Sequence, residues 1–356
     1  MTMTARLVDV AEAAGVSVKT VSNVVHESPH VRPDTRARVE QAIKELGYQP
    51  NRAARQLKAG RTGFIALALP EIETPYFAEL ASRISERAKK EGLIALMELT
   101  GADPVMENRV LTRFGRGVVD GIVFSPLSLT SEEISDHPTN VPMVLLGERA
   151  TPPDHDHVAV RSVDAARRMT EHLIEVGHQR IAAIGHVPDQ GTASTRLTGY
   201  RQALETAAIP LDDDLVVGVP TYSRSAGFDA MNHLLGLTEK PDAVFCFNDT
   251  MAIGAVRACH EAGVRVPQDI AIAGFDNTEE GVYSTPTLTT IAPDLNALAD
   301  KTLTILTQRI GQSSSDTHQP GTDVPGTSSF VRAPEGPPSA PNPHRECPEP
   351  FVCWIG

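Results

Sequence analysis

The chain has 356 residues, of which 41% are hydrophobic and 22% charged, so it has room for two or three domains and is neither disordered nor fibrous in composition. No apolar run reaches the length of a membrane span and no secretory signal precedes the first expected helix, so we expect a cytoplasmic protein with no membrane partner. Residues 1–61 hold ten Lys/Arg and six Asp/Glu, a charge of +4; since the whole chain carries −13, the remainder carries −17, and only the N-terminal segment is suited to bind phosphates.

Residues 7–26 show the pattern of two short helices joined by a tight turn. Gly15 stands where a helix end needs a residue that tolerates positive φ, and Ser17 is placed to cap the second helix. The apolar faces expected to pack together are Val10, Ala11 and Ala14 on the first helix and Val21, Val24 and Val25 on the second. The side chains left facing outward on the second helix are Val18, Lys19, Ser22, Asn23 and His26. Such a face enters the major groove of duplex DNA, although a helical hairpin with a solvated polar face has the same pattern.

A third helix is expected to begin at Pro33 and to stop at Gly47. Its apolar residues at i, i+3, i+4 and i+7 are Val39, Ala42, Ile43 and Leu46. Three small helices would make one compact domain. The basic stretch that follows, residues 50–62, is rich in helix formers and holds Leu57 as its one large apolar residue, so it is expected to be marginal as a free helix.

From residue 62 onward, short apolar runs alternate with helical patterns, which favours parallel sheets covered by helices on both faces. The expected strands are 64–69, 93–99, 121–125, 143–147, 180–184, 243–247 and 270–275. The expected helices are 77–90, 163–176, 195–207, 226–235, 250–262 and 295–310. These strands are too many for one small sheet. We therefore expect an α/β core of two doubly wound subdomains, with a ligand cleft at the carboxyl ends of their strands.

The last 46 residues differ in composition from the rest of the chain. Nine of the 27 prolines lie in residues 311–356, so this tail is expected to be largely disordered, and extended or disordered beyond about Arg332. It contains no leucine heptad, so a coiled coil is not expected there.

Two groups of residues contain the types that commonly bind metal ions. Asp154-His-Asp-His157 follows two prolines between expected strands, and we interpret it as a solvated loop. The tail residues His318, His344, Cys347 and Cys353 lack the spacing of a zinc site. The sequence also holds no GxGxxG, P-loop, GxSxG or HExxH motif. We therefore expect no catalytic residue, no metal and no cofactor.

Several motifs occur together in one register along the chain. In the N-terminal part they are Asp9-Val-Ala-Glu12, Gly15-Val-Ser17, Thr20-Val-Ser22 and Asn51-Arg52-Ala53-Ala54 followed by Leu57. In the core they are Pro75-Tyr-Phe77, His172-Leu173 with Gly177-His178, Arg196-Leu-Thr-Gly-Tyr200, Phe247-Asn-Asp249, Gly274-Phe-Asp276 and Leu288-Thr-Thr-Ile291. With these motifs the sequence resembles the LacI/GalR family of bacterial transcriptional regulators over roughly residues 6–310. The resemblance implies an all-α helix-turn-helix headpiece, a hinge helix and a periplasmic-binding-protein-like core that dimerises.

The resemblance assigns DNA-binding roles to residues of the headpiece and hinge. Val18, Lys19 and Asn23 occupy base-reading positions: chemically, a lysine can donate to guanine, an asparagine can pair with adenine, and a valine can touch a thymine methyl group. Relatives commonly carry Arg where Asn23 stands, so their base preference does not transfer there. The residues expected to contact phosphates or to position the helix are Ser17, Thr20, Ser22, His26, His30 and Asn51, and Arg52 and Ala54 belong to the same interface.

Leu57 looks like the wedge that relatives insert between base pairs in the minor groove, where it kinks the duplex. A leucine that merely packs on the core is the alternative. Because the hinge helix would order only when two copies pair on DNA, anything that separates the copies would remove that order. We therefore expect Leu57→Ala to abolish bending of the DNA.

For a small-molecule effector, the matching core positions are Tyr76, Phe77, Arg196, Tyr222, Asn248 and Asp276. Arg, Asn and Asp offer forked donors and acceptors suited to vicinal hydroxyls, so a sugar is the expected ligand class, with a purine or another metabolite as the alternative. Tyr222 could equally be a core tyrosine. Two departures weaken the transfer, because Gly147 and Arg161-Ser162 stand where relatives often place Asp and Asp-Asn.

Together these observations divide the chain into a headpiece at 1–49, a hinge at 50–62, a core at 63–310 and a tail at 311–356. They predict a homodimeric regulator, most simply a repressor of carbohydrate genes, that binds a pseudo-palindromic operator in double-stranded DNA under effector control. A transport-type solute-binding protein would share the core, but it would have a signal peptide and no headpiece. An enzyme would need a cluster of acid, base or nucleophile, and the sequence shows none.

Overall fold

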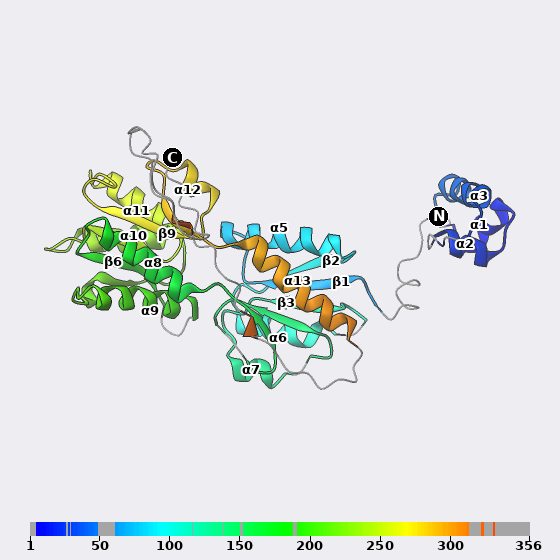
Figure 1. Ribbon diagram of the computed structural model, residues 1–356, viewed down its shortest axis with the longest axis horizontal. Helices are drawn as coiled ribbons and strands as arrows, with labels where there is room; N and C mark the ends of the chain where they lie inside the picture. The colour runs from blue at the N-terminus through cyan, green and yellow to red at the C-terminus, as the bar shows by residue number, and fades with distance from the viewer. Residues whose placement is uncertain are drawn as a thin grey trace, which may run out of the picture. The chain divides into compact units, whose positions relative to one another are not determined.

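The structure is a computed structural model. It describes residues 5–25, 28, 30–48, 61–115, 117–137, 139–149, 152–187, 191–312, 322–323 and 330–331. The chain divides into two compact units, residues 1–62 and 63–356 (Figure 1). Each unit is described by itself below.

The first unit contains three helices, α1 (Leu7–Ala14), α2 (Val18–Val25) and α3 (Pro33–Glu45). Gly15 has φ +63° at the end of α1, and the hydroxyl oxygen of Ser17 accepts a hydrogen bond from the backbone N–H of Thr20 at 3.1 Å. The expected turn and cap are thus confirmed. The buried core of the unit consists of Val10, Ala11, Ala14, Val21, Val24, Val39, Ala42 and Tyr48.

One expected core position of the headpiece is wrong. Leu46 is 41% exposed, because α3 ends at Glu45 and the chain turns through Gly47, whose φ is +59°. The turn buries the next side chain, that of Tyr48, against the three helices. Tyr48, which follows Gly47, is therefore buried in the headpiece core, whereas Leu46, which precedes it, is exposed.

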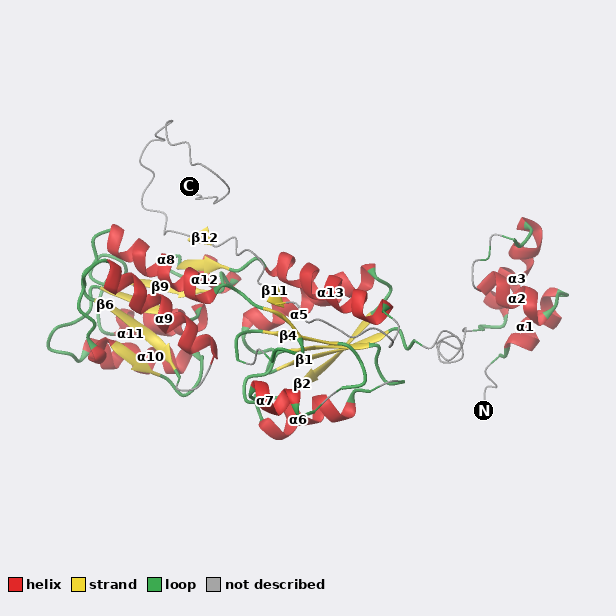
Figure 2. Ribbon diagram, turned by 60° about the horizontal axis from the view of Figure 1, so that its bottom comes forward, coloured by secondary structure: helices red, strands yellow, loops and turns green. Residues whose placement is uncertain are grey.

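The second unit is built around two six-stranded sheets (Figure 2). The first sheet has the order β11-β5-β4-β3-β1-β2 and is parallel throughout. Its strands are β1 (Phe64–Leu69), β2 (Ile94–Leu99), β3 (Gly121–Phe124), β4 (Met143–Leu146), β5 (Asp156–Val158) and β11 (Thr322–Asp323). Its helices are α5 (Pro75–Lys90), α6 (Pro104–Arg113), α7 (Ser131–Ser135) and α13 (Leu295–Gly311).

Alternation along β1 sends successive side chains to opposite faces of this sheet. Ile65, Leu67 and Leu69 pack with α5 and α13, whereas Ala66 and Ala68 pack with α6 and the residues around it. Both faces of the strand are therefore buried, which is why β1 reads as a continuous apolar run.

The second sheet has the order β12-β10-β9-β8-β6-β7. All its pairings are parallel except that of β12 with β10. Its strands are β6 (Ile181–His186), β7 (Val216–Gly218), β8 (Ala243–Cys246), β9 (Ala271–Phe275), β10 (Thr289–Ala292) and β12 (Phe330–Val331). The helical segments are α8 (Ser162–Glu175), α9 (Gly191–Thr206), a 3₁₀ turn (Asp213–Leu215), α10 (Arg224–Leu235), α11 (Asp249–Glu261) and α12 (Glu279–Tyr283).

The chain passes between the two subdomains more than once. It leaves the first sheet after β5 for α8, and it returns after β10 to α13, which packs on α5 of the first subdomain. The later strands β11 and β12 again belong to the first and second sheets, respectively. Repeated crossings of this kind join two rigid bodies while leaving them able to rotate about the crossings.

Helices of the second subdomain pack in two close pairs, α8 with α9 and α10 with α11. Glycines permit the contact between α10 and α11: a Cβ atom on Gly254 would lie 2.0 Å from the carbonyl oxygen of Arg224, and one on Gly227 would lie 2.1 Å from that of Met251. The two backbones thus touch directly, and neither glycine can carry a side chain without moving a helix.

The long apolar strands and amphipathic helices expected from the sequence are present, with bounds that differ by a few residues. The short elements β5, β7, β10, α6, α7 and α12 were not expected. Nor were β11 and β12, which lie in the tail expected to be largely disordered and extend the two core sheets. The interpretation of residues 154–157 as a solvated loop is wrong in part, because Asp156 and His157 are buried in β5. The carboxylate of Asp156 pairs with Arg309 of α13 at 2.7 Å, and His157 contacts the backbone oxygen of Gly147.

Candidate functional site

The exposed side of α2 is the first candidate site. Ser17, Val18 and Lys19 are exposed at the start of the helix, while Thr20, Ser22 and Asn23 are half-buried beside them. Ser17 is partly committed to the cap, and its hydroxyl lies 2.8 Å from that of Thr20. His30 is exposed in the turn before α3. The predicted residues His26, Asn51, Arg52, Ala54 and Leu57 lie outside the described residues.

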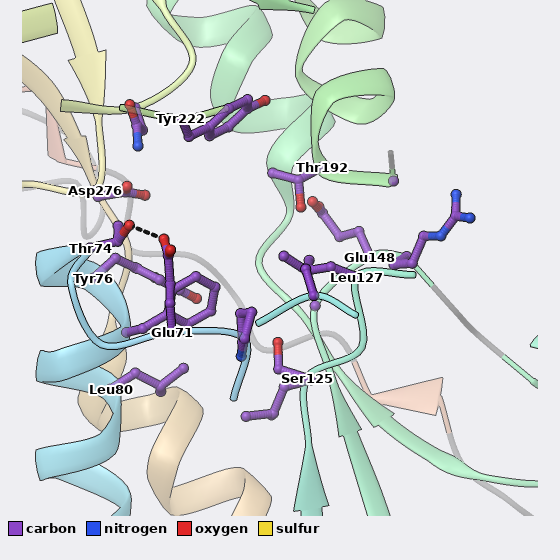
Figure 3. A pocket seen from close by; sticks show the side chains of 18 of the residues that line it. Glu71, Thr74, Tyr76, Leu80, Ser125, Leu127, Glu148, Thr192, Tyr222 and Asp276 are labelled. Carbon is purple, nitrogen blue, oxygen red and sulfur yellow. Dashed lines mark hydrogen bonds between the residues drawn. The ribbon is translucent and has the colours of Figure 1, made fainter. Parts of the chain in front are cut away.

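The second candidate site is a cavity of about 320 Å³ between the two subdomains of the core (Figure 3). Its walls follow the carboxyl ends of strands: Ser125 comes after β3, Gly147 and Glu148 after β4, and Asn248 after β8. Because parallel strands end at one edge of a sheet, the two sheets direct these loops into one space. The volume lies at the lower end of the range for small-molecule pockets.

All six residues predicted for an effector line this cavity, although they are spread over 200 positions of the sequence. They are Tyr76, Phe77, Arg196, Tyr222, Asn248 and Asp276. Tyr76 and Phe77 begin α5 and pack edge to face, with 5.2 Å between ring centroids. Tyr222 donates its hydroxyl hydrogen to the carbonyl oxygen of Gly185 at 2.9 Å, which leaves its ring as a wall. The structure thus assembles an aromatic side and a polar side around one space.

Arg196 is the buried cation of the cavity, with 6% of its surface exposed. Its guanidinium carbon lies 3.5 Å from the ring centroid of Phe275, one terminal nitrogen donates to the carbonyl oxygen of Phe247, and the other lies 3.7 Å from the carboxylate of Asp276. Its Nε atom is buried and has no hydrogen-bond partner among the described residues. Since buried donors are normally satisfied, this N–H is available to a ligand.

Asp276 follows β9 in a backbone conformation that few residues adopt. Its φ is +113° and that of Asn277 is +53°, so two consecutive non-glycine residues lie in the positive region. The turn is held by Asp249, whose carboxylate accepts hydrogen bonds from the backbone N–H of Thr278 at 2.7 Å and from the hydroxyl of Thr290. A strained turn fixed by a buried carboxylate positions Asp276 at the cavity wall.

Asn248 has a fixed orientation because it caps α11. Its side-chain oxygen accepts a hydrogen bond from the backbone N–H of Met251 at 2.8 Å. The amide N–H₂ is therefore the group that Asn248 can offer to a ligand.

Two family models match separate parts of the chain. Residues 6–51 match the model of the bacterial regulatory proteins of the lacI family, and residues 170–332 match a periplasmic binding protein-like domain. The ribose operon repressor of Escherichia coli K12 is 35% identical over 310 residues, which cover 86% of this chain and 94% of that protein. The chain belongs to the LacI family.

Two further likenesses extend over most of this LacI-family chain. The repressor PurR of Mannheimia succiniciproducens is 33% identical over 314 residues, covering 87% of this chain and 93% of PurR. A crystal structure of the lac repressor dimer bound to operator and the anti-inducer ONPF has a TM-score of 0.76 at 30% identity, covering 89% of this chain and 96% of that one. The expected fold class is thus confirmed, with the headpiece at the N-terminus and two parallel sheets in the core.

Sequence reasoning missed several polar residues that line the cavity of this LacI-family protein. They are Glu71, Thr74, Ser125, Glu148, Arg149, Ser162 and Thr192. Glu148 is the most informative, because burial raises the pKa of its carboxyl group while Arg196 lowers it. It directly follows Gly147, the position where relatives often have Asp, and that neighbouring departure was the available signal.

A second missed carboxylate supports the cavity wall from behind. Glu107 of α6 is fully buried and accepts hydrogen bonds from the backbone N–H groups of Leu127, Ser128 and Leu129 at 2.8 to 3.2 Å. Three backbone donors converging on one carboxylate fix the loop after β3, and Leu127 of this loop lines the cavity.

We expect Asp276→Asn to reduce the pH dependence of the free energy of unfolding. Burial raises the pKa of Asp276 from 3.8 to about 8, although the Arg196 guanidinium opposes that rise. Between these two values the folded protein holds a proton that the unfolded chain releases, so the contribution of this group to stability falls as the pH rises. As the pH rises from about 5 to about 8, the difference in the free energy of unfolding between the variant and the natural protein should therefore shift in favour of the variant.

Urea unfolding at both pH values measures this difference. Asp229→Asn is the matched control, since Asp229 is an exposed carboxylate on α10 of the same subdomain. A difference between Asp276→Asn and the natural protein that stays constant with pH would contradict the expectation.

Proposed function

We propose that this protein is a sequence-specific transcriptional repressor whose binding to operator DNA is controlled by a small molecule in the core cavity. The observation that carries the proposal is the exposed N-terminal face of α2 in a helix-turn-helix, on a chain that also holds a polar cavity between two subdomains. The helix-turn-helix distinguishes this chain from a solute-binding protein, which needs only the cavity. The protein acts by binding, not by catalysis, and its place of action is the cytoplasm, where its DNA is.

The headpiece supplies two kinds of DNA contact. The charge of +4 belongs to headpiece and hinge together, because residues 1–49 hold six Lys/Arg and six Asp/Glu, and residues 50–61 add four Lys/Arg. Against −17 on the remainder, this charge attracts phosphates to the hinge end of the DNA-binding segment. Val18 and Lys19 stand exposed at the start of α2, the part of a recognition helix that reaches base edges in the major groove. Asn23 lies half-buried one turn further along, where it can pair with adenine.

The repressor acts as a homodimer, and strand β2 is the surface that supports this. β2 lies at the edge of the first sheet and carries four exposed large apolar side chains: Ile94, Leu96, Met97 and Leu99 are 39–47% exposed. Val105, just after it at the start of α6, is 62% exposed. A monomer would leave this strand open to aggregation, whereas a second copy would cover it and place two headpieces on adjacent half-sites.

The ligand class that fits the cavity is a sugar. Arg196 offers an N–H that has no partner among the described residues, Asn248 offers amide donors, and Asp276 offers carboxyl oxygens. This set can bind neighbouring hydroxyl groups. Tyr222 and Phe77 supply flat apolar walls for the face of a ring. A purine is the alternative, because the same walls fit a planar base. A relative of 33% identity is named the HTH-type transcriptional repressor PurR.

Mobility-shift assays on genomic fragments test the proposal as a whole. The full-length protein should retard a small set of fragments containing a pseudo-palindrome, and a sugar from a panel of pentoses, hexoses and disaccharides should change that retardation. Hypoxanthine and guanine form the second panel. Absence of any sequence-specific shift at low salt would refute the repressor function, and a response to purines alone would refute the sugar.

Lys19→Ala is expected to weaken binding to the selected operator by about tenfold to a hundredfold, with little effect on non-specific DNA, because one base contact contributes about 1–3 kcal/mol. Lys44→Ala is the matched control, since Lys44 is an exposed lysine near the end of α3. Titration of both variants against operator and scrambled duplex measures the effect. Equal losses on the two duplexes for Lys19→Ala would show a phosphate contact instead.

A further inference from the structure

Glu148 lies between the two subdomains and contacts three parts of the core. It follows β4 of the first sheet. One carboxylate oxygen accepts a hydrogen bond from the backbone N–H of Ser162, at the crossing into α8, at 3.3 Å. The other lies 3.0 Å from the hydroxyl of Thr195, on α9 of the second subdomain. One side chain therefore connects the first subdomain with the crossing and with the second subdomain.

The bond from Thr195 is shared. Its hydroxyl also lies 3.0 Å from the carbonyl oxygen of Thr192 in the same helix, so its single hydrogen is divided between the carbonyl and the carboxylate. A carboxylate is the stronger acceptor of the two, since hydrogen bonds to ionised groups are about twice as strong as neutral ones. The contact across the subdomains thus competes favourably with the one inside the helix.

Gly191 brings the two subdomains into backbone contact at the same place. It begins α9, and a Cβ atom built on it would lie 2.2 Å from the carbonyl oxygen of Glu148 and 2.7 Å from the Cα atom of Arg149. Only a residue without a side chain lets the start of α9 approach the loop after β4 this closely. Every larger residue would hold the two bodies apart.

The carboxyl group of Glu148 is also attracted by a charged group of the second subdomain. Its carboxyl group is half withdrawn from water at the cavity wall, and the guanidinium of Arg196 on α9 attracts it. Opening the cleft would move α9, and with it Thr195 and Arg196, away from a carboxylate of the first subdomain. The side chain therefore favours the closed arrangement.

We propose that Glu148 is a positioning residue that latches the two subdomains together across the cavity, with Gly191 providing the close approach that the latch needs. The latch belongs to the chain itself and does not depend on DNA binding. Its link to the ligand rests on the proposed function: a ligand donor that takes the carboxylate from Thr195 would alter the closure, and through it the spacing of the hinge segments.

Spin labels on the two subdomains measure the closure directly. Suitable exposed positions for the labels are Arg109 on α6 and Asp229 on α10, each changed to cysteine. Cys347 and Cys353 are replaced by serine so that they take no label. Cys246 and Cys259 are kept, because they are buried. The labelled full-length chain is mixed with an excess of unlabelled chain, without DNA or ligand, so that each distance joins labels of one molecule. Pulsed electron paramagnetic resonance then gives the distribution of distances between the two labels.

Glu148→Ala and Thr195→Val should each add a population at longer distance, with a shift of about fivefold in the ratio of open to closed forms. Gly191→Val should open the cleft although Glu148 is intact. Glu148→Gln keeps one acceptor oxygen but loses the negative charge, so it should restore only part of the closed population. Circular dichroism and thermal unfolding confirm that each variant is folded.

Two variants control for local effects. Thr198→Val removes a hydroxyl from the same helix, and this hydroxyl donates to the backbone oxygen of Ser194 within that helix. Glu71→Gln changes another carboxylate of the cavity, whose bond to Thr74 lies within the first subdomain. Both should keep the natural distribution. Natural distributions in Glu148→Ala and Thr195→Val would overturn the latch, as would equal opening in Thr198→Val, and none of these outcomes bears on whether the protein binds DNA.

Discussion

Arg196→Met is expected to lower the free energy of unfolding of the core by about 3–5 kcal/mol, the usual cost of removing one partner from a buried charged group. The methionine fills similar space but leaves the carbonyl oxygen of Phe247 without its donor and the carboxyl of Asp276 without its cation. Arg196→Lys should restore little, because a lysine ammonium cannot serve the carbonyl, the carboxylate and the Phe275 ring together. Urea unfolding followed by circular dichroism measures the loss.

A double-variant cycle separates charge from packing at this position. Arg196→Met combined with Asp276→Asn should be clearly less unstable than the sum of the two single losses, because no carboxylate then stands unpaired beside the gap. The loss in Arg196→Met should also grow as the pH rises above about 8, since Asp276 holds its proton below this value and its ionised form lacks a partner above it. Strict additivity, with no pH effect, would show that Arg196 matters only for the space it fills.

Gly254→Ala is expected to destabilise the second subdomain by about 1–3 kcal/mol, against the general rule that alanine stabilises a helix. The added methyl group would lie 2.0 Å from the carbonyl oxygen of Arg224, so α10 and α11 would have to separate. The effect is large because the whole helix pair moves. Thermal and urea unfolding measure it.

Gly311→Ala provides the control for this glycine. Gly311 is also helical, at the end of α13, and a Cβ atom there would meet nothing within 4 Å. It should leave stability unchanged or raise it by up to about 1 kcal/mol. If both alanines acted alike, the close contact between α10 and α11 would not be the cause.

Elements with a strong pattern were predictable from the sequence. β1 and β8 are buried on both faces and read as continuous apolar runs, while α5 and α8 show the spacing of one apolar stripe. β5 and β7 span three residues each, too few for a pattern of their own, and tertiary pairing alone makes them strands. Local sequence therefore predicts the long elements and leaves the short ones undetermined.

Two acidic residues around the cavity could not be predicted from the sequence. Glu107 and Glu148 look like ordinary acidic residues of a helix and a loop, and nothing local distinguishes them from solvated ones. Glu107 is buried and Glu148 is half-buried because distant groups converge on them: backbone N–H groups of residues 127–129 on Glu107, and Ser162 and Thr195 on Glu148. Arg196 and Asp276 were predicted only because their motifs resemble those of a known family.

The path of the chain has a consequence for the order of folding. The residues that form the hydrophobic core of the second subdomain lie in one stretch from α8 to β10, and β12 joins its sheet later, whereas the hydrophobic core of the first subdomain includes α13, more than 130 residues after β5. During synthesis, Leu67, Val144 and the other apolar side chains that α13 covers must wait for it to leave the ribosome. The first subdomain is therefore synthesised first but is the last to complete its hydrophobic core. By then the residues of the second subdomain from α8 to β10 have already been synthesised.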